Sequence, residues 1–118
     1  METNLKFNSA VCTSRAQSER LLALGLKKET ADMHHYKWSE GYWDIQPCPV
    51  RGSEPCYIPA WSLHRLLCLL PREYIYDIDF QRIMQDFVFG TQDMYEEMIS
   101  CIETLIEAGY FYEEYLDK

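Results

Sequence analysis

The sequence predicts a single α+β domain, in which about three helices cover a small antiparallel sheet built from hairpins. Three segments repeat their apolar residues with a helical period, and one segment alternates apolar and polar residues as strands do. The 118 residues have the length of one domain. We therefore expect residues 1–118 to fold as one unit, with 1–10 and 112–118 as the ends that could fray.

The first helix is predicted to begin at Ser14 and to end near Gly25. Ser14 and Gln17 have the spacing of a capping box, in which each side chain accepts a hydrogen bond from the other residue's backbone amide. Leu21 lies on the same side as Gln17, and the glycine provides the left-handed conformation that ends many helices. Residues 27–33 predict a further short helical turn.

The segment MHHYKWSEGYWDIQ predicts a β-hairpin because its apolar and polar residues alternate. A four-residue loop from Ser39 to Tyr42 would pair Trp38 with Trp43 and create an apolar stripe on one face. A three-residue loop would pair Lys37 with Trp43 and lose that stripe. The pairing of apolar side chains on one face of the hairpin therefore predicts the four-residue loop.

Residues 47–59 contain four prolines and a glycine, and they predict an irregular connection. A helix capped by Ser62 is predicted to follow and to run as far as Pro71. Apolar residues occupy most of its circumference: Leu63, Leu66, Leu67, Cys68, Leu69 and Leu70. A helix of this kind is normally buried, so we expect it at the centre of the core, with a partner-binding surface as the alternative.

The segment 74–89 fits two patterns. Tyr74, Tyr76 and Ile78 alternate as in a strand, whereas the later apolar residues also match a helical period. We predict two strands with a tight connection, and a strand followed by a helix is the alternative. On a strand, Asp77 and Asp79 would share one face, where solvated carboxylates are the simplest interpretation.

The last helix is predicted to begin at Thr91 or Asp93 and to end at Gly109. Its apolar side is formed by Met94, Met98, Cys101, Ile102 and Leu105. Its opposite side carries Glu96, Glu103 and Glu107. Such a stripe is typical of a solvated helix face, and the alternative is an acidic protein that presents carboxylates in place of DNA phosphates.

The charge composition narrows the choice of partner. Eleven basic and nineteen acidic residues give a net charge of -8, which opposes binding to nucleic acid or to an anionic membrane. The N-terminal residues do not resemble a signal peptide, and five cysteines without that signal fit a reducing compartment. We therefore expect a cytoplasmic protein that binds another protein, and a homodimer is compatible with the sequence.

The sequence contains no catalytic, metal-binding or cofactor-binding signature, so we expect no cofactor and favour a protein that is not an enzyme. The candidate interaction surface consists of Trp38, Trp43, Tyr57, Trp61, His35, Glu96, Glu103 and Glu107. Tryptophan and tyrosine are favoured at interfaces, although packing in the core is the simpler explanation of these aromatic residues.

The histidines and cysteines give an alternative from another class, a small metal-binding protein or enzyme that uses His35, Cys48 and Cys56. Zinc sites usually contain cysteines two to four residues apart with a second matching pair, and this sequence has neither feature. We expect His34 to pack and His35 to be solvated, because neighbours in a strand point to opposite faces. The cysteines of the helical segments, Cys12, Cys68 and Cys101, are predicted to behave as small apolar residues.

The stretches SRAQSERLLALGLKKETADM, IPAWSLHRLLCLLP and EEMISCIETLIEAGY resemble segments of a family of small uncharacterised proteins from gut anaerobic bacteria and their phages or mobile elements. The strongest elements are TADM (residues 30–33) and PAWSL (residues 59–63). The resemblance implies an intracellular helix-and-hairpin domain with strand between Pro71 and Thr91. It implies no catalytic residue, since the family has no established activity. We therefore predict a non-catalytic accessory or protein-interaction module.

Overall fold

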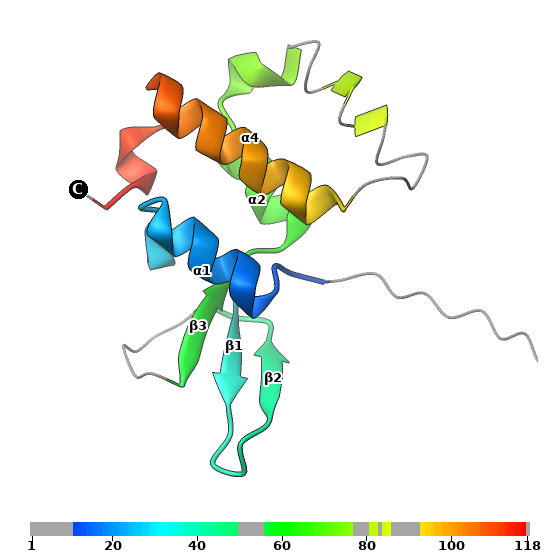
Figure 1. The fold of residues 1–118 in the computed structure, drawn as a ribbon, viewed down its shortest axis with the longest axis vertical. Helices are drawn as coiled ribbons and strands as arrows, with labels where there is room; N and C mark the ends of the chain where they lie inside the picture. The colour runs from blue at the N-terminus through cyan, green and yellow to red at the C-terminus, as the bar shows by residue number, and fades with distance from the viewer. Residues whose placement is uncertain (1–10, 50–55, 77–80, 83, 86–92, 118) are drawn as a thin grey trace, which may run out of the picture.

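The chain has an α+β fold, as predicted, and the part that the structure describes contains the helices α1, α2 and α4 and a three-stranded antiparallel sheet. Figure 1 shows the sheet at one end of the molecule, with the tip of its hairpin pointing away from the helices. Helix α1 (Arg15–Ala23) lies between the strands and α4 (Met94–Ala108), while α2 (Leu63–Leu69) packs against α4. The computed structural model describes residues 11–49, 56–76, 81–82, 84–85 and 93–117. Within these residues, no helix is both long enough and apolar enough to cross a membrane.

Local capping residues fix the two longer helices. The Ser14 hydroxyl accepts a hydrogen bond from the Gln17 amide at 3.1 Å, and the Gln17 side chain accepts one from the Ser14 amide at 2.9 Å, which confirms the predicted capping box. Asp93, rather than Thr91, caps α4 by accepting from the Tyr95 amide at 3.0 Å. Gly109, at a φ of 77°, ends that helix as predicted.

The sheet has the order β2-β1-β3, in which both neighbours run antiparallel to β1. The strands are β1 (Met33–Lys37), β2 (Trp43–Gln46) and β3 (Tyr57–Ala60). The prediction of an irregular connection over residues 47–59 is wrong for β3, which begins within that stretch. Pro59 is tolerated because β3 is an edge strand, where a residue without an N–H can face away from the neighbouring strand.

The predicted register of the β1–β2 hairpin is wrong. Lys37 pairs with Trp43, as in the three-residue alternative, and the loop consists of residues 39–41. The loop geometry explains this outcome, because Gly41 adopts a φ of 95° and its amide bonds to the Trp38 carbonyl at 2.8 Å. A three-residue loop with glycine in the left-handed position is a common hairpin connection. The apolar side-chain pairs that a four-residue loop would create do not outweigh the preference for this three-residue loop.

The leucine-rich helix α2 lies in the core, as predicted, with Leu66 fully buried and Leu69 and Leu70 at most 4% exposed. Leu63 and Leu67 are half-buried. Cys68 is exposed, so the prediction that it packs as a small apolar residue is wrong. The buried core contains Leu21, Leu26, Ala31, Trp61, Leu66, Leu69, Leu70, Met94, Tyr95, Met98, Ile99, Cys101, Ile102, Leu105 and Phe111.

The segment after Pro71 begins with a 3-10 helix, η2 (Arg72–Tyr76), instead of the predicted strand. Its first turn is closed by a hydrogen bond from the Tyr74 amide to the Pro71 carbonyl, which gives these residues a helical rather than an extended backbone. Residues 81–82 and 84–85 are also helical. Asp77 and Asp79 lie outside the described residues, as does most of the predicted second strand.

Residues 111–117 return to the helical part of the domain. Phe111 is buried in the core, and the short 3-10 helix η3 (Glu113–Tyr115) follows it. Leu116 then forms a β-bridge with Leu26, directly after α1. The predicted turn in residues 27–33 is present as η1 (Lys28–Thr30).

Candidate functional site

One face of the sheet carries a group of aromatic side chains, which we call the aromatic face: His34, Tyr36, Trp38, Tyr42 and Tyr57. The Tyr36 ring lies 4.8 Å from the Trp38 ring and 5.1 Å from the Tyr57 ring, between centroids. Tyr36 and Tyr57 are cross-strand partners, so their side chains leave the sheet on the same side. These separations are typical of rings in mutual contact.

The aromatic face contains a shallow cleft of about 290 Å³. Its walls are formed by His34, Tyr36, Trp38, Gln46, Cys48, Pro49 and Tyr57. Trp38 is 39% exposed, and Tyr42 at the hairpin tip is 58% exposed. The cleft therefore offers accessible ring surface beside the start of the proline-rich connection.

His34 is buried at the floor of this cleft, as the prediction that it packs requires. Its Nδ1 lies 2.7 Å from the carbonyl oxygen of Cys48. A carbonyl oxygen only accepts hydrogen bonds, so Nδ1 carries the proton and donates it. This hydrogen bond attaches the proline-rich connection to β1 and fixes one wall of the cleft.

The opposite face of the sheet carries His35 and Trp43. His35 is 8% exposed, and its Nε2 donates to the Thr13 carbonyl at 2.8 Å, so the prediction of a solvated His35 is wrong. The Arg15 guanidinium lies 4.6 Å from the centre of the Trp43 ring, within the range of a cation–π contact. The three-residue loop turned Trp43 to this face, away from Trp38.

Trp61, another predicted surface residue, is fully buried and belongs to the fold. Its Nε1 donates to the Thr30 hydroxyl at 2.9 Å. The next residue, Ser62, donates from its amide to Asp32 at 2.9 Å and from its hydroxyl to the same carboxylate at 2.6 Å. The TADM and PAWSL segments therefore contact each other directly, which gives both motifs a structural role.

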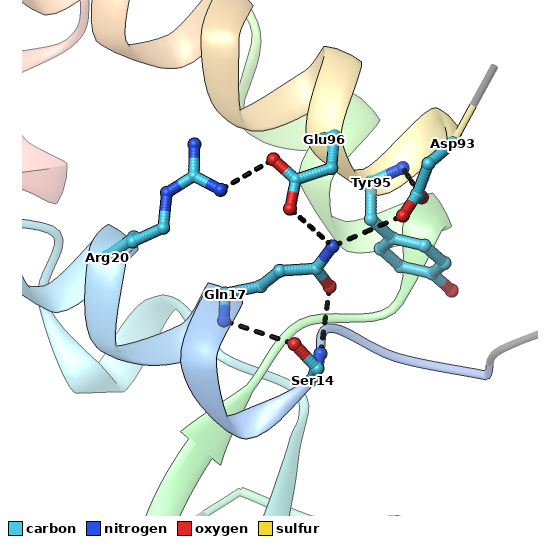
Figure 2. A network of polar contacts seen from close by, with 6 residues as sticks. All are labelled: Ser14, Gln17, Arg20, Asp93, Tyr95 and Glu96. Atoms are coloured by element: carbon cyan, nitrogen blue, oxygen red, sulfur yellow. Dashed lines mark hydrogen bonds and ion pairs between the residues drawn. The ribbon is translucent and has the colours of Figure 1, made fainter.

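The three glutamates of the predicted stripe, Glu96, Glu103 and Glu107, do not form one uniform acidic surface. Figure 2 shows that Glu96 faces α1, where it accepts from Arg20 at 2.5 Å and from Gln17 at 3.0 Å. The hydrogen bond from Arg20, followed by that from Gln17, lowers the pKa of Glu96. Glu103 and Glu107 are exposed to solvent. Glu96 thus joins two helices, whereas Glu103 and Glu107 lie on the exposed side of α4.

The structure does not bring His35, Cys48 and Cys56 together as a metal site. His35 lies on the face opposite the cleft that Cys48 lines. Within the described part of the chain, no three His, Cys, Asp or Glu residues form a group that could hold a metal ion.

Cys12 lacks the environment of a reactive nucleophile. Burial is the main cause that raises the pKa of its thiol, and the nearby Asp32 raises it further. Reactive cysteines are usually exposed and lie in electropositive surroundings that lower the thiol pKa.

No protein-family model, curated protein or solved structure matches this chain significantly. The fold and its surface define a small α+β domain with an exposed aromatic face. Of the predicted aromatic set, Trp38 and Tyr57 belong to this face. The prediction missed His34, Tyr36, Tyr42 and Pro49. Alternation along β1 places His34 and Tyr36 on the side of Trp38 for either loop length, and Gly41, which sets the register, is the signal for Tyr42.

Proposed function

We propose that this chain is a non-catalytic, cytoplasmic protein-interaction module that binds its partner through the cleft of the aromatic face. The observation that carries this proposal is the cluster of exposed tyrosine and tryptophan rings around Trp38. Such rings bury a large area while few rotamers are lost, and they are therefore enriched where proteins bind one another.

The face of the sheet is better suited to binding than its edges. The outer edge of β3 contains Pro59, which has no N–H to donate to an added strand. On the outer strand β2, the amide of Ile45 is already bonded to the Asp44 carboxylate at 2.9 Å. Both features oppose strand addition, which requires a row of available backbone groups.

The chemistry of the cleft favours an extended, proline-containing segment with basic residues. Aromatic grooves bind such segments because the polyproline conformation is already ordered and its rings pack on aromatic faces. The described residues that line the cleft include no lysine or arginine. Asp44 lies on the same face, Glu40 lies in the hairpin loop, and the chain has a net charge of -8. A basic partner is therefore electrostatically favoured.

Fluorescence anisotropy with labelled peptides of about ten residues tests this proposal. Two peptides contain a Pro-X-X-Pro core, one with flanking arginines and one with flanking glutamates. The third is the arginine peptide with alanine in place of each proline. We expect the arginine peptide to bind most tightly and its affinity to fall as salt is added. Equal binding of all three peptides, or no binding of any, would contradict the proposed partner.

Trp38 and Trp43 provide a matched pair of variants, since both are hairpin tryptophans on opposite faces. Trp38→Ala is expected to weaken binding of the arginine peptide at least about tenfold, which corresponds to about 1.4 kcal/mol. Trp43→Ala should leave the affinity within about twofold, because it removes no wall of the cleft. An equal loss in both variants would show that the hairpin, rather than the aromatic face, is required.

A further inference from the structure

The exposed side of α2 carries a histidine and a cysteine one helical turn apart. His64 and Cys68 are separated by four residues, so they lie above one another on the helix. Both residues are exposed, and His64 Nε2 lies 3.5 Å from Cys68 Sγ. The nitrogen and the sulfur are therefore direct neighbours on the same side of the helix.

Their separation matches the distance between two ligands of one zinc ion. Zinc binds histidine nitrogen at about 2.0–2.1 Å and cysteine sulfur at about 2.3 Å, in a tetrahedral arrangement. With a tetrahedral angle between them, these two bonds place nitrogen and sulfur about 3.6 Å apart. The observed separation of 3.5 Å, at which the two side chains hydrogen-bond to each other, is close to this value.

The surroundings leave the ion accessible and incompletely coordinated. His64 and Cys68 border a depression of about 400 Å³, together with Leu67, Leu70, Arg72 and Tyr112. Arg72 adds one exposed positive charge there, which opposes a cation but is screened by solvent. Among the described residues, no third His, Cys, Asp or Glu joins the pair.

We propose that His64 and Cys68 form half of a zinc site, which the same two residues of a second copy of this chain complete. Structural zinc sites almost always have four protein ligands, and two histidines with two cysteines are a common set. A two-fold axis through the ion supplies this set, because each copy then contributes the same surface. Half-buried Leu67 and Tyr112, which is 39% exposed, border the pair and provide apolar contact between the copies.

Metal binding at this site changes the protonation of the cysteines. Each Cys68 thiol loses its proton to the buffer and binds as a thiolate, while each neutral His64 binds through the Nε2 lone pair. The ion keeps its charge and no electron is transferred. Zinc-dependent dimer formation therefore releases two protons for each zinc ion bound. The affinity of the protein for zinc should accordingly decrease as the pH is lowered.

Titration of the reduced protein with Co²⁺ alone tests the proposal, since cobalt bound to thiolate absorbs in the near ultraviolet. We expect saturation at about one ion for two chains, the tetrahedral visible bands of cobalt, and displacement of cobalt by Zn²⁺. Light scattering should show a dimer with metal and a monomer after EDTA treatment. A dimer that is separated by a reductant instead would be a disulfide dimer and would overturn the proposal.

Cys68→Ser and His64→Gln are expected to weaken metal binding by more than about 100-fold, because each removes a direct ligand from both copies. Both side chains are exposed, so circular dichroism should show that the variants remain folded. Cys48→Ser is the matched control, since Cys48 is also exposed and should leave the cobalt spectrum unchanged. Loss of the spectrum in Cys48→Ser but not in Cys68→Ser would overturn the proposed site, as would monomeric binding of one ion per chain.

Discussion

The contact between Asp32 and Ser62 should contribute measurably to stability, because it connects the turn before β1 to the start of α2. Ser62→Ala removes the cap of α2, at a cost of about 1 kcal/mol, and the hydrogen bond to the Asp32 carboxylate. A hydrogen bond to a charged group contributes about 1.5–3 kcal/mol, and we use the lower value because Asp32 is only half-buried. We therefore expect Ser62→Ala to lower the free energy of unfolding by about 2.5 kcal/mol.

A double-mutant cycle isolates the shared bond. Asp32→Ala removes the bonds from both the amide and the hydroxyl of Ser62, so its expected cost is about 3 kcal/mol. The double variant loses the hydroxyl–carboxylate bond only once, which predicts a coupling energy of about 1.5 kcal/mol.

Urea denaturation followed by circular dichroism measures these differences. With a urea dependence of about 1–3 kcal/mol per molar, each single variant should lower the midpoint by about 1–3 M. Ser39→Ala is a suitable control, because the Ser39 hydroxyl donates to exposed Glu40 within the hairpin loop. The reasoning that the two residues interact directly would be refuted if the double variant lost as much free energy of unfolding as Asp32→Ala and Ser62→Ala together, within about 0.5 kcal/mol.

Three further predictions concern the core, the contact between α1 and α4, and cysteine reactivity. Leu66→Ala should lower the free energy of unfolding by about 2.7–5.0 kcal/mol in urea, because Leu66 is fully buried, and a loss under 1 kcal/mol would contradict its core role. The folded-state pKa of Glu96 lies below the usual 4.5, so its contribution is present above pH 4.5 and is lost as the pH falls through the lower folded value. The free energy of unfolding from urea denaturation should therefore differ between the native protein and Glu96→Gln above pH 4.5, by at most about 1 kcal/mol because the pair is exposed, and the two values should converge below that pH. Glu103→Gln should show no such pH dependence. In native protein at pH 8, Cys12 should react with iodoacetamide more slowly than exposed Cys48, as peptide mass spectrometry would show, and equal rates would contradict the raised Cys12 pKa.

The helices were predictable because their signals are local. The box formed by Ser14 and Gln17 and the glycine at 109 lie within a few residues of the helix ends that they define. Such contacts join residues that are close together in the sequence, so a pattern in the sequence is sufficient to identify them.

The sheet was harder to predict because tertiary context and loop geometry determine it. Residues 57–60 contain a proline and form a strand only because they pair with one side of β1. In the hairpin, matching of side chains favoured one loop length, and the left-handed glycine at 41 favoured another. Since neighbouring residues of a strand face opposite sides, this single-residue difference also decided which aromatic residues form the candidate site.

The burial of Trp61 and the exposure of Cys68 also could not be predicted from periodicity. Trp61 precedes α2 and is enclosed by residues from distant segments, including Thr13 and Thr30. Cys68 belongs to the apolar pattern of α2, but α4 covers another part of that helix. Which side of an almost entirely apolar helix meets water depends on where its neighbours lie, and the helix's own sequence does not contain that information.

The position of α1 has a consequence for how the chain folds. Arg20 is held by a glutamate 76 residues later, and the backbone of Gly25 and Lys27 bonds to Asp117 and Tyr115. A large loop must therefore close before the first helix gains its stabilising contacts, and closure of such loops slows folding. A fragment that lacks α4 and the residues after it should leave α1 only transiently helical, since nine residues are too few for a stable isolated helix in water.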